Sequence, residues 1–315
     1  MIFSIIIPAK NEEKNLARCL ASISKVDFPD AEYEIIVVDN GSTDTTVQLA
    51  RTTGAEVYIQ PELTVAGLRN FGARQAKGSI LVFLDADCTV PCDWLHKAKL
   101  YADDRTVAGF GSPPVVPEQA SWVPKAWFVV RSKNSLHGED VPWLESMNLF
   151  VRRDIFLELG GFNENLVTCE DYDLSLRIKA KGRLISDSRI VAIHHGEANN
   201  LAVFWRKERW RGTSNLSGIR SHRLTLTEVP SLLLPVVHWL AIVLLLALAL
   251  GGVVGVVEYQ LPLIVLMLWQ IPLFLLALYK CGYSKGILIV FQLHLLLNVY
   301  FAARGASLVG PVVWK

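Results

Sequence analysis

The sequence predicts an α/β fold with a doubly wound, mostly parallel sheet, joined to C-terminal helices apolar enough to cross a membrane. Short apolar runs alternate with amphipathic segments; the runs lie at residues 3–8, 33–39, 55–59 and 80–84. This alternation is typical of βαβ units, in which helices join neighbouring parallel strands. Farther along, residues 229–257 contain no charged residue, although 19% of the whole chain is charged. The pattern therefore predicts a sheet domain followed by a membrane domain.

The first half of the sheet domain has recognisable element ends. The first strand should end at Pro8, and Asn11 is a candidate cap for the helix that follows. After the second strand, an Asn-Gly turn leads to a helix that Ser42 or Thr43 would cap. A helix over 64–77 then precedes the fourth strand.

The second half of this domain has a less regular pattern. We expect a strand over 107–112, followed by a proline-rich connection. The aromatic stretch 122–130 is either an interfacial segment or a core strand. Residues 146–162 indicate a strand, a short helix and a glycine turn, 168–182 a helix that opens with acids, and 183–195 a pair of strands. We expect one domain over residues 1–203.

The stretch 77–94 carries the clearest chemical signal. Its buried strand ends in Asp85 and Asp87. Alternate residues of an extended chain share a side, so both carboxylates can face one small volume beyond the strand end. Ligands of open α/β sheets bind at this edge, and Mg²⁺ commonly takes one or two carboxylates together with substrate phosphates. The alternative is that Asp85 caps a turn and Asp87 caps a helix that starts near Pro91.

Several other classes of site find no support. The first strand is followed by PAKNEE and not by the glycine-rich turn of a dinucleotide-binding fold, and there is no P-loop sequence. The five cysteines lack metal-ligand spacing, and their odd number suits a reducing compartment. The net charge of +1 points to no partner, and we expect no nucleic-acid partner. The strand-end acids fit instead a site that reads a base through one carboxylate and a diphosphate through a metal.

Three uncharged runs predict membrane helices at about 235–257, 261–279 and 286–303, within a membrane domain of residues 229–315. A span of the hydrocarbon core needs about 20 residues, so the first helix should start near Pro235, inside its longer run. The third run is marginal in length and carries Gln292, His294 and Asn298. It either spans the membrane or re-enters and faces protein.

Loop charges predict the orientation of these helices. Lys280 and Lys285 lie between the second and third runs, whereas the loop around Glu258 has no Lys or Arg. Under the positive-inside rule, the sheet domain and the 280–285 loop are cytoplasmic. The N-terminal apolar run is too short for a signal peptide and lacks a basic flank. We expect a multi-pass protein of the cytoplasmic (inner) membrane, with its sheet domain in the cytoplasm.

Residues 204–228 form a basic, aromatic segment directly before the membrane domain. Its basic residues are Arg206, Lys207, Arg209, Arg211, Arg220 and Arg223, and it also contains Trp205 and Trp210. One interpretation is that the segment binds anionic lipid head groups, at about 1 kcal/mol per basic residue near the surface. The other is that some of these arginines close over a diphosphate, which a planar guanidinium suits.

Four sequence blocks occur in an order and spacing that resemble the family 2 glycosyltransferases, which have the GT-A fold. The blocks are SIIIPAKNEE, IIVVDNGSTDTT, GLRNFGARQAKGSILVFLDADC and GGFNENLVTCEDYDLSLRIKAKG, and they lie within residues 3–195. The resemblance implies a nucleotide-sugar donor and Mg²⁺ or Mn²⁺ as cofactor.

The resemblance also implies roles for individual residues. Those that would line the donor pocket are Pro8, Ala9, Asn11 and Glu12, with Asp39 on the base and Arg69 near the donor. Asp85 and Asp87 would form the DxD motif, in which Asp87 is the main metal ligand. His194 or His195 would lie near the metal or the diphosphate. Arg206, Arg209 and Trp210 are similar to the QxxRW element of polysaccharide synthases, with Arg206 in place of Gln.

Asp171, next to Glu170, resembles the catalytic base of the family, within an element that reads Cys169-Glu170-Asp171 here. Each of these roles has a structural alternative. For the two acids, it is that they are favourable charges in the first turn of a helix. The histidines could be purely structural, and Arg69 could only cover apolar surface with its stem. Asp39 could be a turn residue.

Together with the resemblance, these features predict a metal-dependent glycosyltransferase that acts on a membrane-associated acceptor such as a lipid-linked glycan or a glycolipid. The resemblance implies that the transfer is inverting. Alternatives are transfer to a polyprenyl phosphate and processive polysaccharide synthesis. An alternative of another class is a non-catalytic membrane scaffold that binds sugar nucleotides. Loss of a nucleoside diphosphate would be assisted by a metal, and general-base help is typically worth 10²–10⁴-fold.

Overall fold

The structure is a computed structural model, which describes residues 1–131, 137–166, 168–213, 229–256, 258, 260–282 and 286–309. The chain divides into two compact units. Unit 1 comprises residues 1–118 and 134–197, and unit 2 comprises residues 119–133 and 198–315. The division after residue 197 differs from the boundary that we placed at residue 203. Residues 119–133, which we placed in the sheet domain, belong to unit 2.

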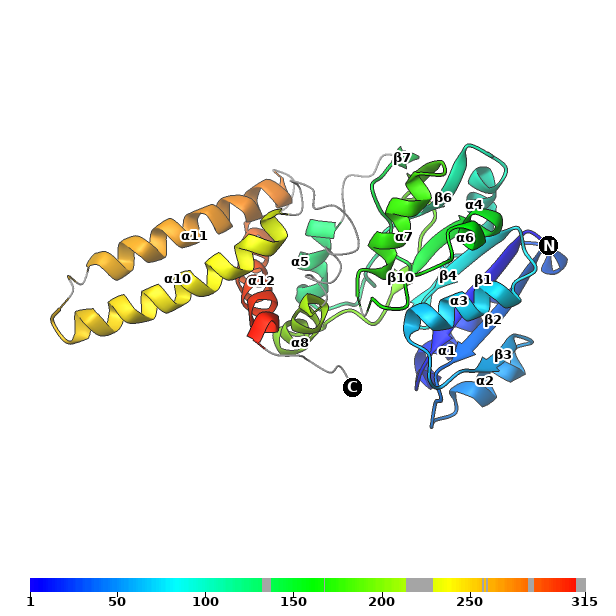
Figure 1. The fold of residues 1–315 in the computed structure, drawn as a ribbon, viewed down its shortest axis with the longest axis horizontal. Coiled ribbons are helices and arrows are strands. Elements are labelled where there is room, and N and C mark those ends of the chain that lie inside the picture. The colour runs from blue at the N-terminus through cyan, green and yellow to red at the C-terminus, as the bar shows by residue number, and fades with distance from the viewer. Residues whose placement is uncertain are drawn as a thin grey trace. The chain divides into compact units, whose positions relative to one another are not determined.

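Unit 1 is built on an eight-stranded mixed sheet with the strand order β3-β2-β1-β4-β8-β6-β9-β7 (Figure 1). The bounds are β1 Phe3–Ala9, β2 Tyr33–Asp39, β3 Glu56–Ile59, β4 Ile80–Leu84, β6 Val107–Gly111, β7 Glu139–Asp140, β8 Asn148–Arg152 and β9 Arg183–Ser186. The first four strands run parallel, whereas β8 is antiparallel to both β4 and β6. A two-stranded sheet pairs β5 (Cys88–Thr89) with β10 (Ile193–His194). The predicted fold class, a doubly wound and mostly parallel sheet, is confirmed.

Helices cover both faces of the sheet because alternate strand residues point to opposite sides. On β1, Phe3, Ile5 and Ile7 join one buried cluster and Ile6 joins another. The first cluster includes residues of α1 (Glu13–Ile23), α2 (Thr46–Thr52) and α4 (Trp94–Ala102). The second includes residues of α3 (Val65–Gln75), α6 (Arg153–Glu158) and α7 (Glu170–Lys179), while the short helix η1 (Asp30–Glu32) precedes β2. With both faces filled, the strand ends are left for polar side chains.

Several predicted element ends in unit 1 are wrong. Helix α1 starts at Glu13 and not at Asn11, and α2 has Thr45, not Ser42 or Thr43, in the N-cap position. The physical reason is that these polar side chains bind the neighbouring loop instead. Asn11 Oδ1 accepts from the Thr43 N–H at 2.8 Å, and Ser42 Oγ accepts from the main-chain N–H of Asn11 at 2.8 Å. The helix expected near Pro91 begins at Trp94 as α4.

The first strand does not end at Pro8, because β1 continues to Ala9. The last residue pair between β1 and β4 joins Ile6 to Phe83, whereas the pairing of β1 with β2 runs to Ala9 and Asp39. Pro8 therefore lies beyond the β4 ladder, where its missing N–H costs the strand little.

All the regular secondary structure among the described residues of unit 2 is helical. Its helices are α5 (Trp122–Arg131), α8 (Leu201–Gly212), α10 (Val229–Val253), α11 (Gln260–Cys281) and α12 (Ile287–Ala306), followed by η2 (Ser307–Val309). The stretch 122–130 is thus a helix, so the core-strand alternative is wrong. α10, α11 and α12 are each long and apolar enough to cross a membrane. α10 begins at Val229 and continues through Pro235, which we expected near its start.

Helix α12 is the central helix of unit 2, because it packs against α5, α8, α10 and α11. Asn298, one of the polar residues of the third apolar run, pairs with Gln270 of α11. The Gln270 Nε2 donates to Asn298 Oδ1 at 3.0 Å, and the Asn298 Nδ2 donates back to Gln270 Oε1 at 3.2 Å. The amide of Asn298 therefore faces protein.

Candidate functional site

Asp85 and Asp87 lie directly beyond β4, at the carboxyl edge of the parallel strands. Their side chains keep 27% and 20% of their surface exposed, so both carboxylates remain accessible to a ligand. Asp39 ends β2 at the same edge of the sheet, with β1 between the two strands. The strand ends therefore gather acids as the sequence predicts.

Arg69, on α3, joins two acidic elements that are far apart in the sequence. Its Nη2 donates to Asp85 Oδ1 at 2.7 Å, and its Nη1 donates to Glu170 Oε1 at 3.0 Å. The guanidinium is buried, and its Nε has no hydrogen-bond partner among the described residues. Burial alone would lower the pKa of Arg69, but Asp85 and Glu170 outweigh it and raise the pKa, so the side chain stays charged. Arg69 therefore ties the end of β4 to the start of α7.

Helix α7 opens with Glu170 and Asp171, where the helix dipole favours acids. The residue before them, Cys169, has φ of 68°, and Asn11 has φ of 53°. Among the described residues these are the two non-glycine positions with positive φ. Such backbone costs about 1–3 kcal/mol and tends to occur at functional sites. Both strained positions fall in loops that the sequence singles out.

Asp171 has an unusual affinity for protons. Burial, then Glu170 and Glu145, raise the pKa of Asp171 to about 7. Its Oδ1 accepts from the Tyr172 N–H at 2.8 Å, which offsets part of this shift. A carboxyl with a pKa near the working pH is suited to general-base chemistry.

The two histidines at the end of β10 differ in their surroundings. His194 is buried, with Nε2 at 3.0 Å from Asp87 Oδ2 and Nδ1 at 3.1 Å from Glu197 Oε1. Burial lowers the pKa of His194, but Asp87 and Glu197 outweigh it and raise the pKa to about 9. His195 instead pairs through Nε2 with Thr89 Oγ1 at 2.9 Å, and burial and Arg18 lower its pKa. Of the two rings, that of His194 is the one held against a DxD carboxylate.

Asp85 and Asp87 offer carboxylate oxygens of the kind that Mg²⁺ and Mn²⁺ prefer. A Cβ at Gly196 would overlap the Asp87 carboxylate, so this position leaves room that a side chain would fill. Burial, then Asp87, Asp44 and Asp85, raise the pKa of Glu12, which shows that acids converge here. Among the described residues, no group of three His, Cys, Asp or Glu side chains is arranged to hold a metal. Hard carboxylate oxygens fit Mg²⁺ or Mn²⁺ when substrate phosphates complete the coordination.

The segments 8–12 and 39–46 are joined by hydrogen bonds. The Thr43 N–H donates to Asn11 Oδ1 at 2.8 Å, and the Glu12 N–H donates to Thr46 Oγ1 at 2.9 Å. Pro8 and Ala9 are buried in β1. Asp39 is fully buried, and its carboxylate accepts from the N–H and the hydroxyl of Ser42. Asp39 thus holds the turn, and its expected role in binding a base remains a prediction.

Arg206, Arg209 and Trp210 lie on α8 in unit 2. The last part of the basic segment, residues 214–228 with Arg220 and Arg223, lies outside the described residues, as does Lys285. The helix is anchored by Glu208, which is buried between Arg211 Nη1 at 2.7 Å and Arg304 Nη2 at 3.0 Å.

Gly196, Glu197 and Glu145 belong to the site but were not expected from the sequence. The first two follow the histidine pair, and an acid three residues after His194 was a usable signal. The contact of Glu197 with His194, and the influence of Glu145 on Asp171, arise from tertiary packing that no local pattern announces.

Comparison with known proteins agrees with this geometry. Residues 4–156 match a family model described as glycosyl transferase family 2. The chain is 30% identical over 194 residues to glycosyltransferase AglE of Haloferax volcanii, covering 57% of this chain and 62% of that protein. It is 25% identical over 226 residues to a beta-monoglucosyldiacylglycerol synthase of Nostoc, covering 66% and 47%. The matches thus span less than two thirds of the length of these relatives.

Solved structures share the fold. The mannosyltransferase PcManGT of Pyrobaculum calidifontis, in complex with GDP-Man and Mn²⁺, superposes with a TM-score of 0.69 at 21% identity, covering 98% of this chain and 86% of that chain. Staphylococcus aureus TarS 1-349, in complex with UDP-GlcNAc, gives a TM-score of 0.53 at 18% identity, covering 99% and 93%. At these identities the likeness establishes the fold, and the predicted GT-A class is confirmed.

Proposed function

We propose that this chain, whose residues 4–156 match the glycosyl transferase family 2 model, moves a sugar from a nucleotide-diphosphate donor to a membrane-associated acceptor. We propose further that the transfer depends on a metal and inverts the anomeric centre. The observation that carries the proposal is the Arg69 bridge between Asp85 and Glu170. It holds the DxD acids and the acids of α7 beside each other, although they come from distant parts of the sequence. A donor-binding group and a base are thus available at one site.

Asp87 and Asp85 would hold Mg²⁺ or Mn²⁺ together with the donor phosphates. When bound, the metal would neutralise the negative charge that develops on the leaving diphosphate. His194 holds the Asp87 carboxylate from one side, and Arg69 holds Asp85 from the other. These contacts pre-orient both oxygen donors. The PcManGT complex contains a nucleotide sugar and Mn²⁺, which supports the same chemistry here.

Asp171 would act as the base. It would take the proton of the acceptor hydroxyl as that oxygen bonds to the anomeric carbon and the bond to the diphosphate breaks. A single displacement of this kind inverts the anomeric centre. Glu170 is engaged with Arg69, so it orients the element and leaves the proton transfer to Asp171. The donor base would be bound by the segments around Asn11 and Asp39.

The acceptor would be presented at a membrane. Three helices of unit 2 are long and apolar enough to span one, and the name of the Nostoc relative denotes synthesis of a glycolipid. Arg206, Arg209 and Trp210 on α8 would bind anionic head groups, or the diphosphate of the donor. We infer that the protein lies in the cytoplasmic membrane, with unit 1 in the cytoplasm, from the position of Lys280 before the third helix.

The test is donor turnover by the purified chain in detergent, with UDP-, GDP- and dTDP-sugars, Mn²⁺ or Mg²⁺, and a membrane lipid extract. We expect one donor to release nucleoside diphosphate only with metal, and Asp87→Ala and Asp171→Asn to abolish the release. If the chain binds a sugar nucleotide but turns over no donor with any lipid, the non-catalytic scaffold replaces the transferase.

A further inference from the structure

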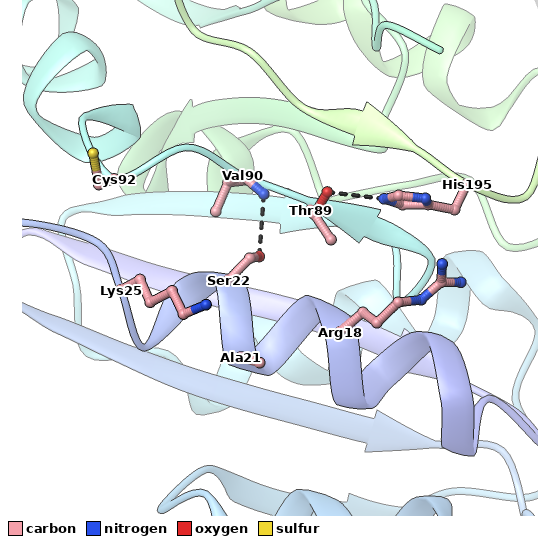
Figure 2. A pocket seen from close by; sticks show the side chains of 8 residues that line it. All are labelled: Arg18, Ala21, Ser22, Lys25, Thr89, Val90, Cys92 and His195. Atoms are coloured by element: carbon pink, nitrogen blue, oxygen red, sulfur yellow. Dashed lines mark hydrogen bonds between the residues drawn. The ribbon is translucent and has the colours of Figure 1, made fainter. Parts of the chain in front are cut away.

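A surface pocket of unit 1 lies between α1 and β5, outside the acidic cluster (Figure 2). It is an open depression with a volume of about 510 Å³. Its lining includes Arg18, Ala21 and Lys25 from the α1 region, Val90 and Cys92 after β5, and His195. We call it the Arg18 pocket. None of the described residues that line it is acidic, although the neighbouring candidate site is rich in acids.

The Arg18 pocket has a cation at each end, and the part between them is lined by Ala21, Ser22, Thr89 and Val90. Arg18 lies on α1 and Lys25 just beyond its end, a separation of about 10 Å at the helical rise. Figure 2 shows the Arg18 guanidinium at the His195 end and Lys25 at the end near Cys92. Ala21 and Val90 lie between them. An elongated ligand with an anionic group would match this distribution of charge.

The Arg18 end of the pocket adjoins the candidate metal site. The His195 N–H donates to the main-chain oxygen of Asp87 at 2.9 Å, and the His195 ring pairs with Thr89 Oγ1 at 2.9 Å. The segment that forms the pocket wall is therefore the continuation of the DxD segment. A molecule held in the pocket would reach the rim of the transfer site.

We propose that the Arg18 pocket binds an organic phosphate, with the phosphate at the Arg18 end and the carbon skeleton along Ala21 and Val90. A guanidinium matches phosphate oxygens with two parallel hydrogen bonds, and Lys25 adds positive charge at the other end of the pocket. This site is separate from the donor phosphates at Asp85 and Asp87. This proposal rests on the proposed function in one respect: it takes the bound organic phosphate to be the acceptor. The acceptor would then carry a phosphate and would not be a neutral glycolipid.

Cys92 provides a readout that needs no catalysis. Its thiol is exposed in the pocket lining, whereas Cys19, Cys88 and Cys281 are buried. We would measure the alkylation rate of Cys92 by peptide mass spectrometry on the full chain in neutral detergent, with n-hexyl phosphate as probe and n-hexyl glucoside as the uncharged control. The half-exposed Cys169 of the same protein serves as internal reference.

We expect hexyl phosphate to slow the alkylation of Cys92 at least fivefold and to leave Cys169 unchanged. Arg18→Gln should raise the half-protecting concentration about tenfold, the loss expected for one charge-assisted contact. Lys25→Gln should raise it less, because Lys25 lies about 10 Å from the Arg18 end along the helix. Lys14→Gln removes an exposed cation from α1 outside the pocket and should match the wild type. No protection by hexyl phosphate, or undiminished protection in both pocket variants, would overturn the assignment.

Two further arms identify the source of the phosphate. If hexyl phosphate protects Cys92 and inorganic phosphate does not, the pocket binds an organic acceptor. If inorganic phosphate protects Cys92 equally well, the pocket is a site for the free anion, and the acceptor assignment is wrong. Donor hydrolysis without acceptor is measured in parallel. If hydrolysis persists in Arg18→Gln while protection is lost, the pocket is distinct from the donor site, as proposed. If the wild-type protein hydrolyses no donor but hexyl phosphate still protects Cys92, the proposed function is wrong and the pocket assignment stands.

Discussion

His194 holds Asp87 across 107 positions of sequence, with ring Nε2 at 3.0 Å from the carboxylate Oδ2. The other ring nitrogen lies 3.1 Å from Glu197 Oε1, so the imidazole is fixed between two acids. A carboxylate that is held in place before its ligand arrives loses less freedom on binding. The arrangement resembles the way in which ligating side chains in metal sites are oriented by hydrogen-bonded partners.

We predict that His194→Ala weakens metal activation more than it weakens folding. Loss of such an orienting partner typically costs 10–100-fold in metal affinity or activity, so the Mn²⁺ concentration for half-maximal donor hydrolysis should rise at least about tenfold. The exposed His96, which lies 3.9 Å from Asp27, offers His96→Ala as a control. An unchanged metal dependence in His194→Ala would show that this histidine only fills the end of β10.

Arg69→Ala should destabilise unit 1 strongly. Removing one partner of a buried ion pair leaves uncompensated charge and typically costs about 3–5 kcal/mol, and here Asp85 and Glu170 both lose their partner. Arg69→Lys keeps the charge but not the two-pronged geometry, so it should recover part of the stability and little of the activity. The measurement is the midpoint of thermal unfolding by tryptophan fluorescence, with the exposed Arg51→Ala as control. Equal midpoints for Arg69→Ala and Arg51→Ala would contradict the bridge.

Much of this site was predictable because strand ends are local features. The apolar run before Asp85 and Asp87 specified a buried strand, and the sheet places the carboxyl end of such a strand at the ligand edge. The fold class followed from the same alternation of strands and helices. Helix caps were predicted less well, because Asn11 and Ser42 bind each other across two loops and leave the helix starts to Glu12 and Thr45.

The tertiary partners of the site were not predictable from one sequence. Arg69 resembled any helical arginine until its contacts with Asp85 and Glu170 were known. The two histidines at 194 and 195 were equivalent by pattern, and packing alone directs one to Asp87 and the other to Thr89. The aromatic stretch 122–130 gave no clear period, and its helix packs against α12, a partner far away in the sequence.

Activity should fall below neutral pH because the base must be deprotonated. With the pKa of Asp171 raised to about 7, the rate should drop about tenfold for each pH unit below 7. The folded carboxyl retains its proton between 3.8, the ordinary value for an aspartate, and about 7. The folded state therefore binds more protons than the unfolded state in this window, so this group makes folding less favourable as pH rises through it.

Asp171→Asn should therefore remove this contribution to the pH dependence of stability as well as the activity. The measurements are the pH profile of donor turnover at saturating metal and the thermal midpoint between pH 5 and 8. A wild-type profile that is flat from pH 5 to 8 would count against Asp171 as the base.

Gly196→Ala should impair the site although it replaces none of the proposed ligands. A Cβ at this position would overlap the Asp87 carboxylate, so either the carboxylate or the loop after β10 must shift. We expect donor hydrolysis to fall at least tenfold, since a shift of about 1 Å in a positioned group can cost 10²-fold. Gly286→Ala is the matched control, because its Cβ would meet nothing within 4 Å and its φ is −57°. Hydrolysis by Gly196→Ala at the wild-type rate would show that Asp87 need not occupy the position seen here.

Glu208 should decide whether α8 stays docked on α12. Its carboxylate is buried and accepts from Arg211 on its own helix and from Arg304 on α12. In Glu208→Ala both arginines lose this anion, while the Tyr300 ring, 5.1 Å from the guanidinium carbon of Arg304, still holds that side chain on α12. We expect amide hydrogen exchange across α8 to accelerate at least tenfold, because local opening follows the loss of tertiary contacts.

The exposed acid Glu258 gives the control Glu258→Ala, which should leave the exchange of α8 unchanged. Because α8 carries Arg206, Arg209 and Trp210, binding of the same variants to anionic vesicles is measured in parallel. Faster exchange combined with weaker vesicle binding in Glu208→Ala would tie lipid contact to this ion pair. Unchanged exchange would show that apolar packing alone docks the helix, since the buried carboxylate would then contribute nothing to the position of α8.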